Sequence, residues 1–336
     1  FFFPLMLLLI GTSNLLVIYI GGQQYINGEI AELGTIAEFI IYVNMLTWPV
    51  ASVGWVTSLV QQAEASQKRI NVFLKQKPSV FNTEKQPSII KGKIEFKNVH
   101  FIYKDTNIEA LKGVSFTVEQ GKTLAVIGKT GSGKTTILEL IGRMYNATKG
   151  NITIDDISIK NVNLHSLRDS IGYVPQDPFL FSDTLNNNIK FGKNNATNQE
   201  VVQAAKDAAV HNNIINFSKG YDTILGERGI TLSGGQKQRV SIARAFIKSP
   251  QILLLDDCLS AVDTETEEQI LNTIEKISKN TTTIIVSHRI SSVKNADHII
   301  VLEDGQIIQE GTHNQLVRKN GYYKTLYKKQ LQEFSS

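Results

Sequence analysis

The sequence contains one cysteine, Cys258, in 336 residues, and this excludes an internal disulfide. A chain without disulfides is typical of a reducing compartment, and the position of Cys258 in an apolar run predicts a packing role. The six histidines have no spacing typical of zinc ligands, so the sequence predicts no zinc site. The sequence begins Phe-Phe-Phe-Pro, with neither a methionine nor a basic segment, which argues against a secretory signal peptide.

Positive charge is missing from the first 67 residues. No lysine or arginine precedes Lys68. The charged residues of this segment are all acidic: Glu29, Glu32, Glu38 and Glu64. Because the whole chain has a formal charge of +4 and this segment carries −4, residues 68–336 carry +8. A nucleic-acid surface would need arginines clustered with exposed aromatic residues. The sequence has no such cluster, so it favours a solvated basic surface and no nucleic-acid partner.

Two long apolar segments predict membrane helices. Residues 1–20 contain no charged residue, and as a helix they would span roughly 30 Å, the thickness of the hydrocarbon core of a bilayer. The second segment covers residues 36–60, and its Pro49 would be costly in a soluble helix but is tolerated in a membrane helix. The cations that follow, from Lys68 to Lys77, place the loop around Gly28 outside and the rest of the chain in the cytoplasm.

The composition changes after the second apolar segment. Residues 78–93 include Pro78 and Pro87 and predict a linker. From residue 94 onward, short β-rich runs such as TLAVIG, QILLLD and TTIIVS alternate with helical stretches, which predicts an α/β domain. Near the end, Asp304-Gly305 between two apolar runs predicts a β-hairpin. We therefore predict membrane helices over residues 1–77, a linker over 78–93 and an α/β domain over 94–336.

The segment GKTGSGKT fits the pattern G-x-x-x-x-G-K-[ST] between a predicted strand and a predicted helix over residues 135–145. The glycines let backbone N–H groups surround phosphates, and the helix N-terminus adds the positive end of its dipole. Lys134 would contact the β- and γ-phosphates, and Thr135 would hold Mg²⁺. The predicted nucleotide-binding residues here are Gly128, Lys129, Thr130, Gly131, Ser132, Gly133, Lys134, Thr135 and Thr136.

A second predicted strand, QILLLD, ends at two adjacent aspartates. Its apolar residues predict a buried parallel strand. Asp256 at its end would complete the Mg²⁺ site, and Asp257 would be the carboxylate that orients or deprotonates the attacking water. An acidic residue after a strand is common by itself. Beside a phosphate loop, it predicts an ATP-hydrolysing site.

The segment LSGGQKQR leads into a helical stretch shortly before that strand. Ser-Gly-Gly by itself is often a flexible turn, but LSGGQ in this position resembles the signature of the ATP-binding cassette (ABC) ATPases. The resemblance implies an α/β P-loop NTPase domain with an antiparallel β subdomain and a helical subdomain that carries the signature. It also implies that two cassettes pack head to tail, so that the signature of one chain contacts the ATP bound by the other. The signature residues are Ser233, Gly234, Gly235 and Gln236.

Four further motifs of this family stand in matching order. Tyr103 resembles the aromatic residue that stacks on adenine. Gln176 resembles the Q-loop glutamine, which coordinates Mg²⁺ and faces the membrane domain. Asp263 ends SAVD, which resembles the D-loop facing the opposite cassette, and His288 resembles the switch histidine.

The resemblance is closest to the exporter branch of the family. Glu227 matches the exporter X-loop, and residues 1–77 resemble the last two membrane helices. The resemblance implies a half-transporter with four further membrane helices upstream, embedded in a cell membrane, the bacterial cytoplasmic membrane by expectation, with its ATPase domain in the cytoplasm. It implies ATP and Mg²⁺ as ligands and a second half-transporter as partner. The transported substrate is bound by membrane helices in this family, and the sequence does not identify it.

Asp257 departs from the family pattern, which usually has a glutamate at this position. Aspartate is one methylene shorter, which withdraws the carboxylate by roughly 1.5 Å, and a misplacement of about 1 Å can cost around a hundredfold in rate. Two hypotheses follow: a homodimer that hydrolyses ATP with Asp257 and His288, or a heterodimer in which this chain has a degenerate site and its signature completes the partner's site. A third hypothesis, a soluble ABC ATPase, conflicts with the two apolar segments.

Overall fold

The structure, a computed structural model, describes residues 2–226, 232–259 and 263–335. It divides into two compact units, Phe1–Pro78 and Ser79–Ser336, each described here by itself. Glu227 of the predicted X-loop and residues 260–262 of SAVD lie outside the described residues.

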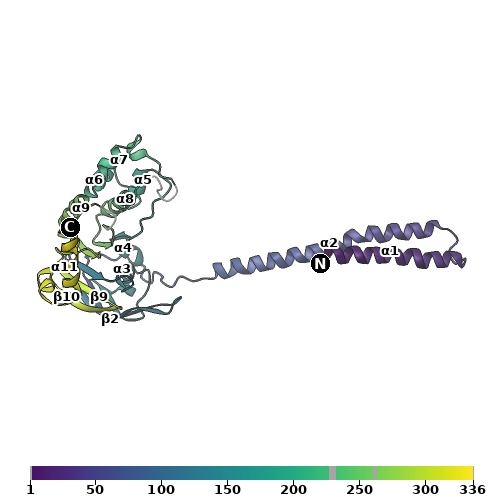
Figure 1. Cartoon of the computed structure of the whole chain (residues 1–336), viewed down its shortest axis with the longest axis horizontal. Helices are drawn as coiled ribbons and strands as arrows, with labels where there is room; N and C mark the ends of the chain where they lie inside the picture. Colours follow the sequence, from purple (N-terminus) through teal and green to yellow (C-terminus); the bar gives the residue numbers. More distant parts are fainter. Residues whose placement is uncertain (1, 227–231, 260–262, 336) are drawn as a thin grey trace. The chain divides into compact units, whose positions relative to one another are not determined.

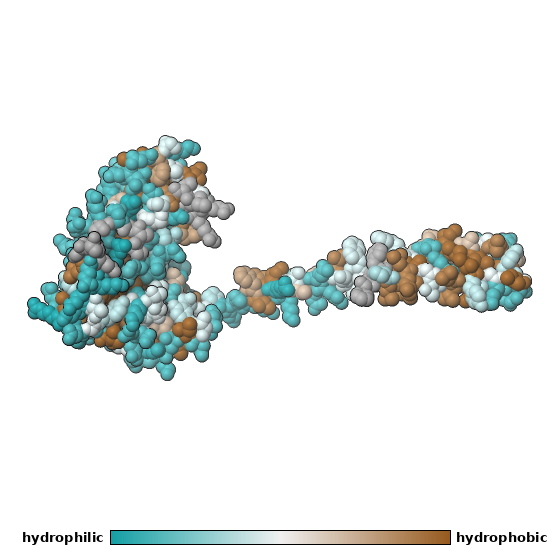
Figure 2. Space-filling model, in the orientation of Figure 1, coloured by the Kyte–Doolittle hydropathy of each residue, from teal (hydrophilic) through white to brown (hydrophobic). Residues whose placement is uncertain are grey.

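The first unit consists of two helices, α1 (Phe2–Ile26) and α2 (Gly34–Leu74). Both are long and apolar enough to cross a membrane, and the apolar window of each has 0% of its residues buried. Leu15 and Trp48, for example, expose 69% and 76% of their surface. Figure 2 shows the apolar side chains of this unit on its surface. An unburied apolar surface of this extent suits helices that lie in lipid.

The helix α2 runs through Pro49 and continues 14 residues beyond the apolar segment, which was predicted to end at residue 60. The two helices approach closely at Gly21, where an added Cβ would lie 3.0 Å from Ile36 Cγ1. Small residues at such contacts let membrane helices pack through van der Waals contacts.

The second unit contains two sheets in its described residues, and it has the predicted α/β P-loop architecture with an antiparallel subdomain (Figure 1). The larger sheet has the order β10-β9-β3-β8-β7-β6; the smaller has the order β2-β1-β4-β5 and is antiparallel. In the larger sheet the strands from β9 to β6 run parallel, and β10 is antiparallel to β9. The strands are β1 (Ile94–Tyr103), β2 (Ile108–Val118), β3 (Thr123–Gly128), β4 (Lys149–Ile154), β5 (Ile157–Ser158), β6 (Ile171–Val174), β7 (Ile252–Asp256), β8 (Thr282–Val286), β9 (His298–Glu303) and β10 (Gln306–Gly311).

The larger sheet lies between two hydrophobic cores. Along β7, Leu253 and Leu255 face one core, while Ile252 and Leu254 face the other. This alternation explains why the strand is apolar at every position, as expected for a parallel strand covered on both faces. The helices of this unit are α3 (Lys134–Ile141), α4 (Leu164–Asp169), α5 (Leu185–Lys190), α6 (Asn198–Asp207), α7 (His211–Ile215), α8 (Gly234–Phe246), α9 (Thr264–Ser278), α10 (His313–Arg318) and α11 (Tyr322–Ser335).

Apart from the larger sheet that lies between them, the two cores contain residues from different helices and sheets. One contains residues of α3 and of the antiparallel sheet. The other contains residues of the helices α5 to α11. The helices α5, α6, α7 and α8 form a group apart from α3 (Figure 1), and this group is the predicted helical subdomain that carries the signature. Cys258 is buried in the second of these cores, which agrees with its predicted packing role.

The predicted hairpin is confirmed between β9 and β10. Asp304 and Gly305 both have positive φ angles, 47° and 80°, as the type I′ hairpin turn requires at both central positions.

The predicted helix over residues 135–145 was wrong at its C-terminal end. The helix α3 ends at Ile141, because Arg143 takes a left-handed conformation with φ 47°. The N–H of Met144 then donates to the carbonyl of Glu139 at 2.8 Å, and the N–H of Arg143 donates to that of Leu140 at 3.1 Å. These two bonds are the Schellman pattern that closes a helix, here formed without a glycine at the left-handed position.

Residues 78–93, the predicted linker, contain neither helix nor strand. The end of this segment is nevertheless fixed to the second unit. The carboxylate of Asp155 accepts hydrogen bonds from the backbone N–H groups of Lys91, Gly92 and Lys93 at 2.6, 3.0 and 2.9 Å. Earlier residues of the segment bond to this unit too: the N–H of Leu164 donates to Asn82 Oδ1 at 2.9 Å, and Thr83 Oγ1 donates to the carbonyl of Lys160 at 2.9 Å.

Candidate functional site

Four neighbouring parallel strands end at one edge of the larger sheet, and a predicted site residue follows or ends each of them. β3 leads into the phosphate loop, β8 into His288, β7 ends at Asp256, and β6 leads into Gln176. The carboxyl ends of parallel strands meet at the same edge, so the fold gathers residues that are far apart in the sequence. This edge is the candidate site.

The phosphate loop needs its glycines for two different reasons. Gly131 and Gly133 have φ angles of 80° and 99°, in the region that side chains rarely adopt. A Cβ at Gly133 would also collide with the carbonyl oxygen of Ala110, whereas nothing lies within 4 Å of a Cβ at Gly131. Gly128 has no unusual φ, but a Cβ there would collide with the carbonyl oxygen of Leu302 on β9. The loop is thus held against the neighbouring backbone by close approach.

The side chain of Lys134 folds back onto the phosphate loop. Its Nζ donates to the carbonyl oxygens of Gly128 and Lys129 at 2.9 and 2.7 Å, and burial lowers the pKa of the amine. The neighbouring Ser132 exposes only 3% of its surface, and its Oγ has no hydrogen-bond partner within the described ranges. A buried hydroxyl without a partner is costly unless a ligand satisfies it. A desolvated ammonium and an unsatisfied donor in one loop fit a bound phosphate group.

The remaining predicted residues of this loop contribute differently. The side chain of Lys129 pairs with Glu303 at 2.7 Å, so its backbone N–H is the group available to a phosphate. Thr130 is exposed, and Thr136 is buried and bonds to Tyr103.

Thr135 and Asp256 form the part of the site that suits a metal ion. The Thr135 hydroxyl donates to Asp256 Oδ1 at 3.2 Å. Asp256 exposes 2% of its surface, and this burial raises the pKa of the carboxyl, against the opposing effects of Thr135 and Lys134. A hydroxyl and a carboxylate fit Mg²⁺, which binds one or two protein oxygens together with substrate phosphates. The described residues include no group of three His, Cys, Asp or Glu side chains that could hold a metal by themselves.

Gln176 lies two residues beyond the end of β6, whose Val174 pairs with Leu255 of β7. Its side chain is exposed. Its predicted role in Mg²⁺ binding stays a prediction.

Asp257 and His288 are brought into direct contact. The Nδ1 atom of His288 lies 2.9 and 3.0 Å from the two carboxylate oxygens of Asp257. A carboxylate only accepts hydrogen bonds, so Nδ1 carries the proton, and in the neutral ring Nε2 is the acceptor. Asp257 has a φ of 45°, and its N–H donates to the carbonyl of Val286 at 2.9 Å. A left-handed aspartate at the end of a buried strand is local strain of the kind that concentrates at functional sites.

Tyr103 lies against the first turn of α3. Its hydroxyl is 2.9 Å from Thr136 Oγ1 and donates to Glu139 Oε2 at 2.7 Å. The ring packs edge-on against Phe101 and Tyr145, with centroids 4.8 and 5.5 Å away. Burial raises the pKa of Tyr103 to about 12. The tyrosine is therefore held next to the phosphate loop, and its stacking on adenine stays a prediction.

The signature forms the N-terminus of α8 in the helical subdomain. Ser233 Oγ accepts from the N–H of Gln236 at 3.3 Å, and Gln236 Oε1 accepts from the N–H of Ser233 at 3.0 Å, which is a capping box. Gly234 and Gly235 lie in the first turn. A Cβ at Gly234 would meet nothing within 4 Å, so the described chain gives no packing reason for glycine there. Among the described residues, the hydrogen bonds of the signature stay within α8 and its N-cap, and none reaches the phosphate loop.

Asp263 has a local role in the structure. It is the N-cap of α9, and its Oδ1 accepts from the N–H of Thr266 at 3.0 Å. Its predicted contact with a second cassette remains to be tested.

Sequence reasoning missed Glu267 on α9. Its side chain exposes 4% of its surface and accepts hydrogen bonds from Arg289 at 2.7 Å, Ser291 at 2.9 Å and Ser292 at 2.7 Å. Glu267 therefore fixes the segment that follows His288. One signal of this role was present in the sequence: Glu267 precedes the buried Ile270 and Ile274 by three and seven residues, which places a charged residue on the apolar face of the helix.

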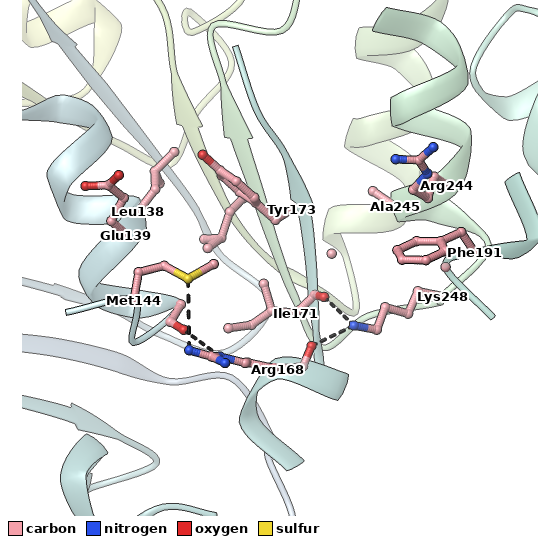
Figure 3. Close-up of a pocket in the computed structure, with 14 residues that line it drawn as sticks. Leu138, Glu139, Met144, Arg168, Ile171, Tyr173, Phe191, Arg244, Ala245 and Lys248 are labelled. Atoms are coloured by element: carbon pink, nitrogen blue, oxygen red, sulfur yellow. Dashed lines mark hydrogen bonds between the residues drawn. The ribbon is translucent and has the colours of Figure 1, made fainter. Parts of the chain in front are cut away.

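A pocket of about 280 Å³ lies beside this site, between α3, β6 and α8 (Figure 3). No predicted site residue lines it. The cationic side chains that line the pocket donate hydrogen bonds to backbone carbonyls. Arg168 donates to the carbonyl of Arg143 at 2.9 Å, and Lys248 donates to the carbonyl of Ile171 at 2.9 Å. Arg244 donates to the carbonyl of Asn188 at 2.8 Å. These charges are satisfied within the fold, and the pocket is not a phosphate site.

Comparisons with known proteins match nearly the whole length of this chain. A family model described as "ABC transporter" matches residues 111–260. A Bacillus subtilis protein named "Probable multidrug resistance ABC transporter ATP-binding/permease protein YheI" is 42% identical over 98% of this chain and 56% of its own length. The Escherichia coli "Multidrug resistance-like ATP-binding protein MdlA" is 40% identical, over 98% of this chain and 56% of its own length. The chain thus spans little more than half the length of these relatives.

A solved structure has the same fold. The chain described as "Structure of a bacterial Atm1-family ABC exporter with ATP bound" superposes with a TM-score of 0.77 and is 37% identical, over 89% of this chain and 53% of that one. The match confirms the predicted combination of N-terminal helices and an α/β ATPase domain.

Proposed function

Because this chain carries the ATP-binding domain of the ABC transporter family, we propose that it is the C-terminal part of a half-transporter that uses ATP to export a substrate across a membrane. The observation that carries the proposal is the division of the nucleotide machinery. One edge of the sheet gathers Lys134, Asp256 and His288, while the signature lies elsewhere, on an exposed helix N-terminus. Such a division suits a site completed by a second cassette.

The residues at the sheet edge have distinct roles in this proposal. The phosphate loop and Lys134 bind the phosphates of ATP, and Tyr103 stacks on adenine. Thr135 and Asp256, with Gln176, hold Mg²⁺, which would neutralise phosphate charge. Asp257 orients or deprotonates the attacking water.

His288 contributes through its orientation. The contact between Nδ1 and Asp257 directs the opposite edge of the ring, with Nε2, away from that carboxylate. We assign Nε2 the contact with the reacting γ-phosphate. A histidine with a fixed tautomer and orientation costs no reorganisation during the reaction.

The second cassette supplies the rest of the site. Ser233, Gly234 and Gly235 would contact the γ-phosphate bound by the partner, and Asp263 would lie at the same interface. Open space at Gly234 supports this role, since glycine there serves close approach by something outside the chain.

The partner is a second half-transporter, either a copy of this chain or a different one. Asp257 in place of glutamate fits both partners. A copy would hydrolyse ATP with Asp257 and His288, whereas a different chain would compensate for this weakened site by using the competent signature of this chain. In that case ATP bound here is hydrolysed poorly, and the partner's site supplies most of the turnover.

The membrane part follows from the two apolar helices and from the relatives. We place α1 and α2 in the bacterial cytoplasmic membrane, as part of a multi-pass domain with the ATPase unit in the cytoplasm. ATP favours the closed cassette pair and hydrolysis releases it. The membrane helices then switch between inward and outward states by a population shift.

The test is Gly234→Asp in the full-length transporter in proteoliposomes. A carboxylate has room at this position in the isolated chain but would repel a phosphate across the interface. We expect ATP turnover to fall at least about a hundredfold, with unchanged nucleotide affinity at the Lys134 site and unchanged thermal stability. Normal turnover in this variant would contradict a head-to-tail pair.

A further inference from the structure

We propose that Gln330, on the C-terminal helix α11, is a positioning residue that holds the backbone of the His288 segment and so sets the His288 ring against Asp257. The kinetic part of this inference rests on the proposed hydrolysis, and the structural part does not. Gln330 is far from these residues in the sequence and belongs to none of the predicted motifs.

The side-chain amide of Gln330 makes two hydrogen bonds to one short segment. Its Oε1 accepts from the N–H of Ile290 at 2.8 Å, and its Nε2 donates to the carbonyl oxygen of His288 at 2.8 Å. The two bonds lie on either side of Arg289. One planar amide thus satisfies a donor and an acceptor of the backbone, and this fixes both the position and the rotation of the segment.

The position of Gln330 on α11 shows that this contact is specific. Tyr323, Leu326 and Tyr327 pack against a hydrophobic core, and Gln330 continues their spacing of three, four and seven residues. Tyr323 is fully buried, and its hydroxyl lies 2.7 Å from Nδ1 of His313. An apolar residue is expected at position 330 on this face. A half-buried amide is tolerated there because both of its polar atoms are bonded.

The segment is held from two sides. Glu267 on α9 binds the side chains of Arg289, Ser291 and Ser292, all of which follow His288. Gln330 holds the carbonyl group of His288 itself. Loss of Gln330 would therefore leave the segment attached at Glu267 but release the residue that carries the imidazole.

The consequence is a link between the end of the chain and the reaction. The His288 ring meets Asp257 at 2.9 and 3.0 Å, and a displacement of the backbone by a fraction of an ångström would lengthen both contacts. Rates respond steeply to misplacement of this kind. Movement of α11, or of anything bound to it, would change ATP turnover without touching the nucleotide.

The test compares Gln330→Leu with Gln330→Glu. Leucine fills similar space and removes both hydrogen bonds, whereas glutamate keeps an acceptor for the N–H of Ile290 and loses the donor to His288. Gln332→Ala is the matched control, since Gln332 is an exposed glutamine on the same helix. Each variant is made in the full-length transporter in proteoliposomes, and if the partner is a different chain, its catalytic carboxylate is replaced so that turnover reports the Asp257 site. The readouts are kcat, KM for ATP, amide hydrogen exchange at Ile290 and thermal stability.

We expect Gln330→Leu to lower kcat about tenfold, with KM changed less than twofold, and to accelerate exchange of the Ile290 amide about tenfold, as expected from the loss of hydrogen bonds. Gln330→Glu should protect the Ile290 amide but still lower kcat, and Gln332→Ala should match the wild type. Unchanged Ile290 exchange in Gln330→Leu would overturn the contact. Faster exchange with unchanged kcat, or a loss of kcat that only accompanies a loss of thermal stability in both Gln330 variants, would overturn the positioning role. If the wild type has no turnover, the proposed function fails, and Ile290 exchange still decides the contact.

Discussion

His288 and Asp257 form a hydrogen-bonded pair in which one ring nitrogen, Nδ1, lies almost equally far from both carboxylate oxygens, at 2.9 and 3.0 Å. The Asp257 side chain exposes 16% of its surface and that of His288 exposes 55%, so the aspartate is the enclosed member of the pair. Asp257 can thus contribute in two ways: it can orient the His288 ring, and it can orient or deprotonate the attacking water.

Two substitutions separate these two roles of Asp257. Asp257→Asn keeps an oxygen acceptor for Nδ1 but cannot take a proton, so we expect ATP to bind normally and turnover to fall at least about a hundredfold. Asp257→Glu restores the missing methylene, and we expect turnover to rise about tenfold. Steady-state ATPase rates and retention of labelled ATP provide the measurement, with the catalytic carboxylate of a non-identical partner replaced so that turnover reports the site of this chain. If neither substitution changes turnover, Asp257 is not the catalytic carboxylate of this chain.

Much of the fold could be predicted because its elements are strongly patterned. The run TLAVIG coincides with β3, and Asp304-Gly305 forms the predicted hairpin. The end of α3 could not be predicted, since the left-handed residue that closes it is Arg143, not the glycine that precedes it. An arginine in that conformation is held there by its surroundings, which the local sequence does not show.

The residues of the candidate site also divide into those that the sequence predicted and those that it did not. Lys134, Asp256 and His288 were predicted because each belongs to a motif at the end of a strand. Glu267 and Gln330 were missed, because their only signal is a polar residue on an apolar helix face, and their partners are backbone or side-chain groups distant in sequence. Tertiary contacts of this kind give little trace in a single sequence.

Lys134→Ala should abolish tight ATP binding. The ammonium already turns into the phosphate loop, where burial lowers its pKa, and an anionic phosphate would replace the two carbonyl contacts. We expect nucleotide affinity, measured by titration calorimetry, to fall at least about a hundredfold. Lys129→Ala is the control, because that side chain pairs with Glu303, and its affinity should stay within about threefold. Equal losses in both variants would argue against a specific role for Lys134.

Glu200 should make the helical subdomain sensitive to acid. Hydrogen bonds from Lys193 and from Thr197 lower the pKa of Glu200 to about 2 from its usual 4.5. Because the folded pKa is depressed, the carboxylate stabilises the fold above pH 4.5, and this contribution is lost as the pH falls from 4.5 toward 2. Thermal melts should show wild type more stable than Glu200→Gln at pH 6, with the difference shrinking toward pH 3. A difference independent of pH would contradict this origin.

Gly131→Ala and Gly133→Ala should separate backbone strain from steric collision. Both glycines have positive φ angles, and an alanine in that region costs about 1–2 kcal/mol. Space is open at Gly131, so the loop can relax when ATP is absent and the strain is imposed only on binding. We therefore expect roughly a tenfold loss of ATP affinity, with little change in melting temperature. At Gly133 the new methyl group would also collide with the carbonyl oxygen of Ala110, which must displace either the loop or β2. We therefore expect Gly133→Ala to abolish ATP binding and to lower the melting temperature by several degrees. Similar affinities for the two variants would show that the contact with Ala110 does not hold the loop in place.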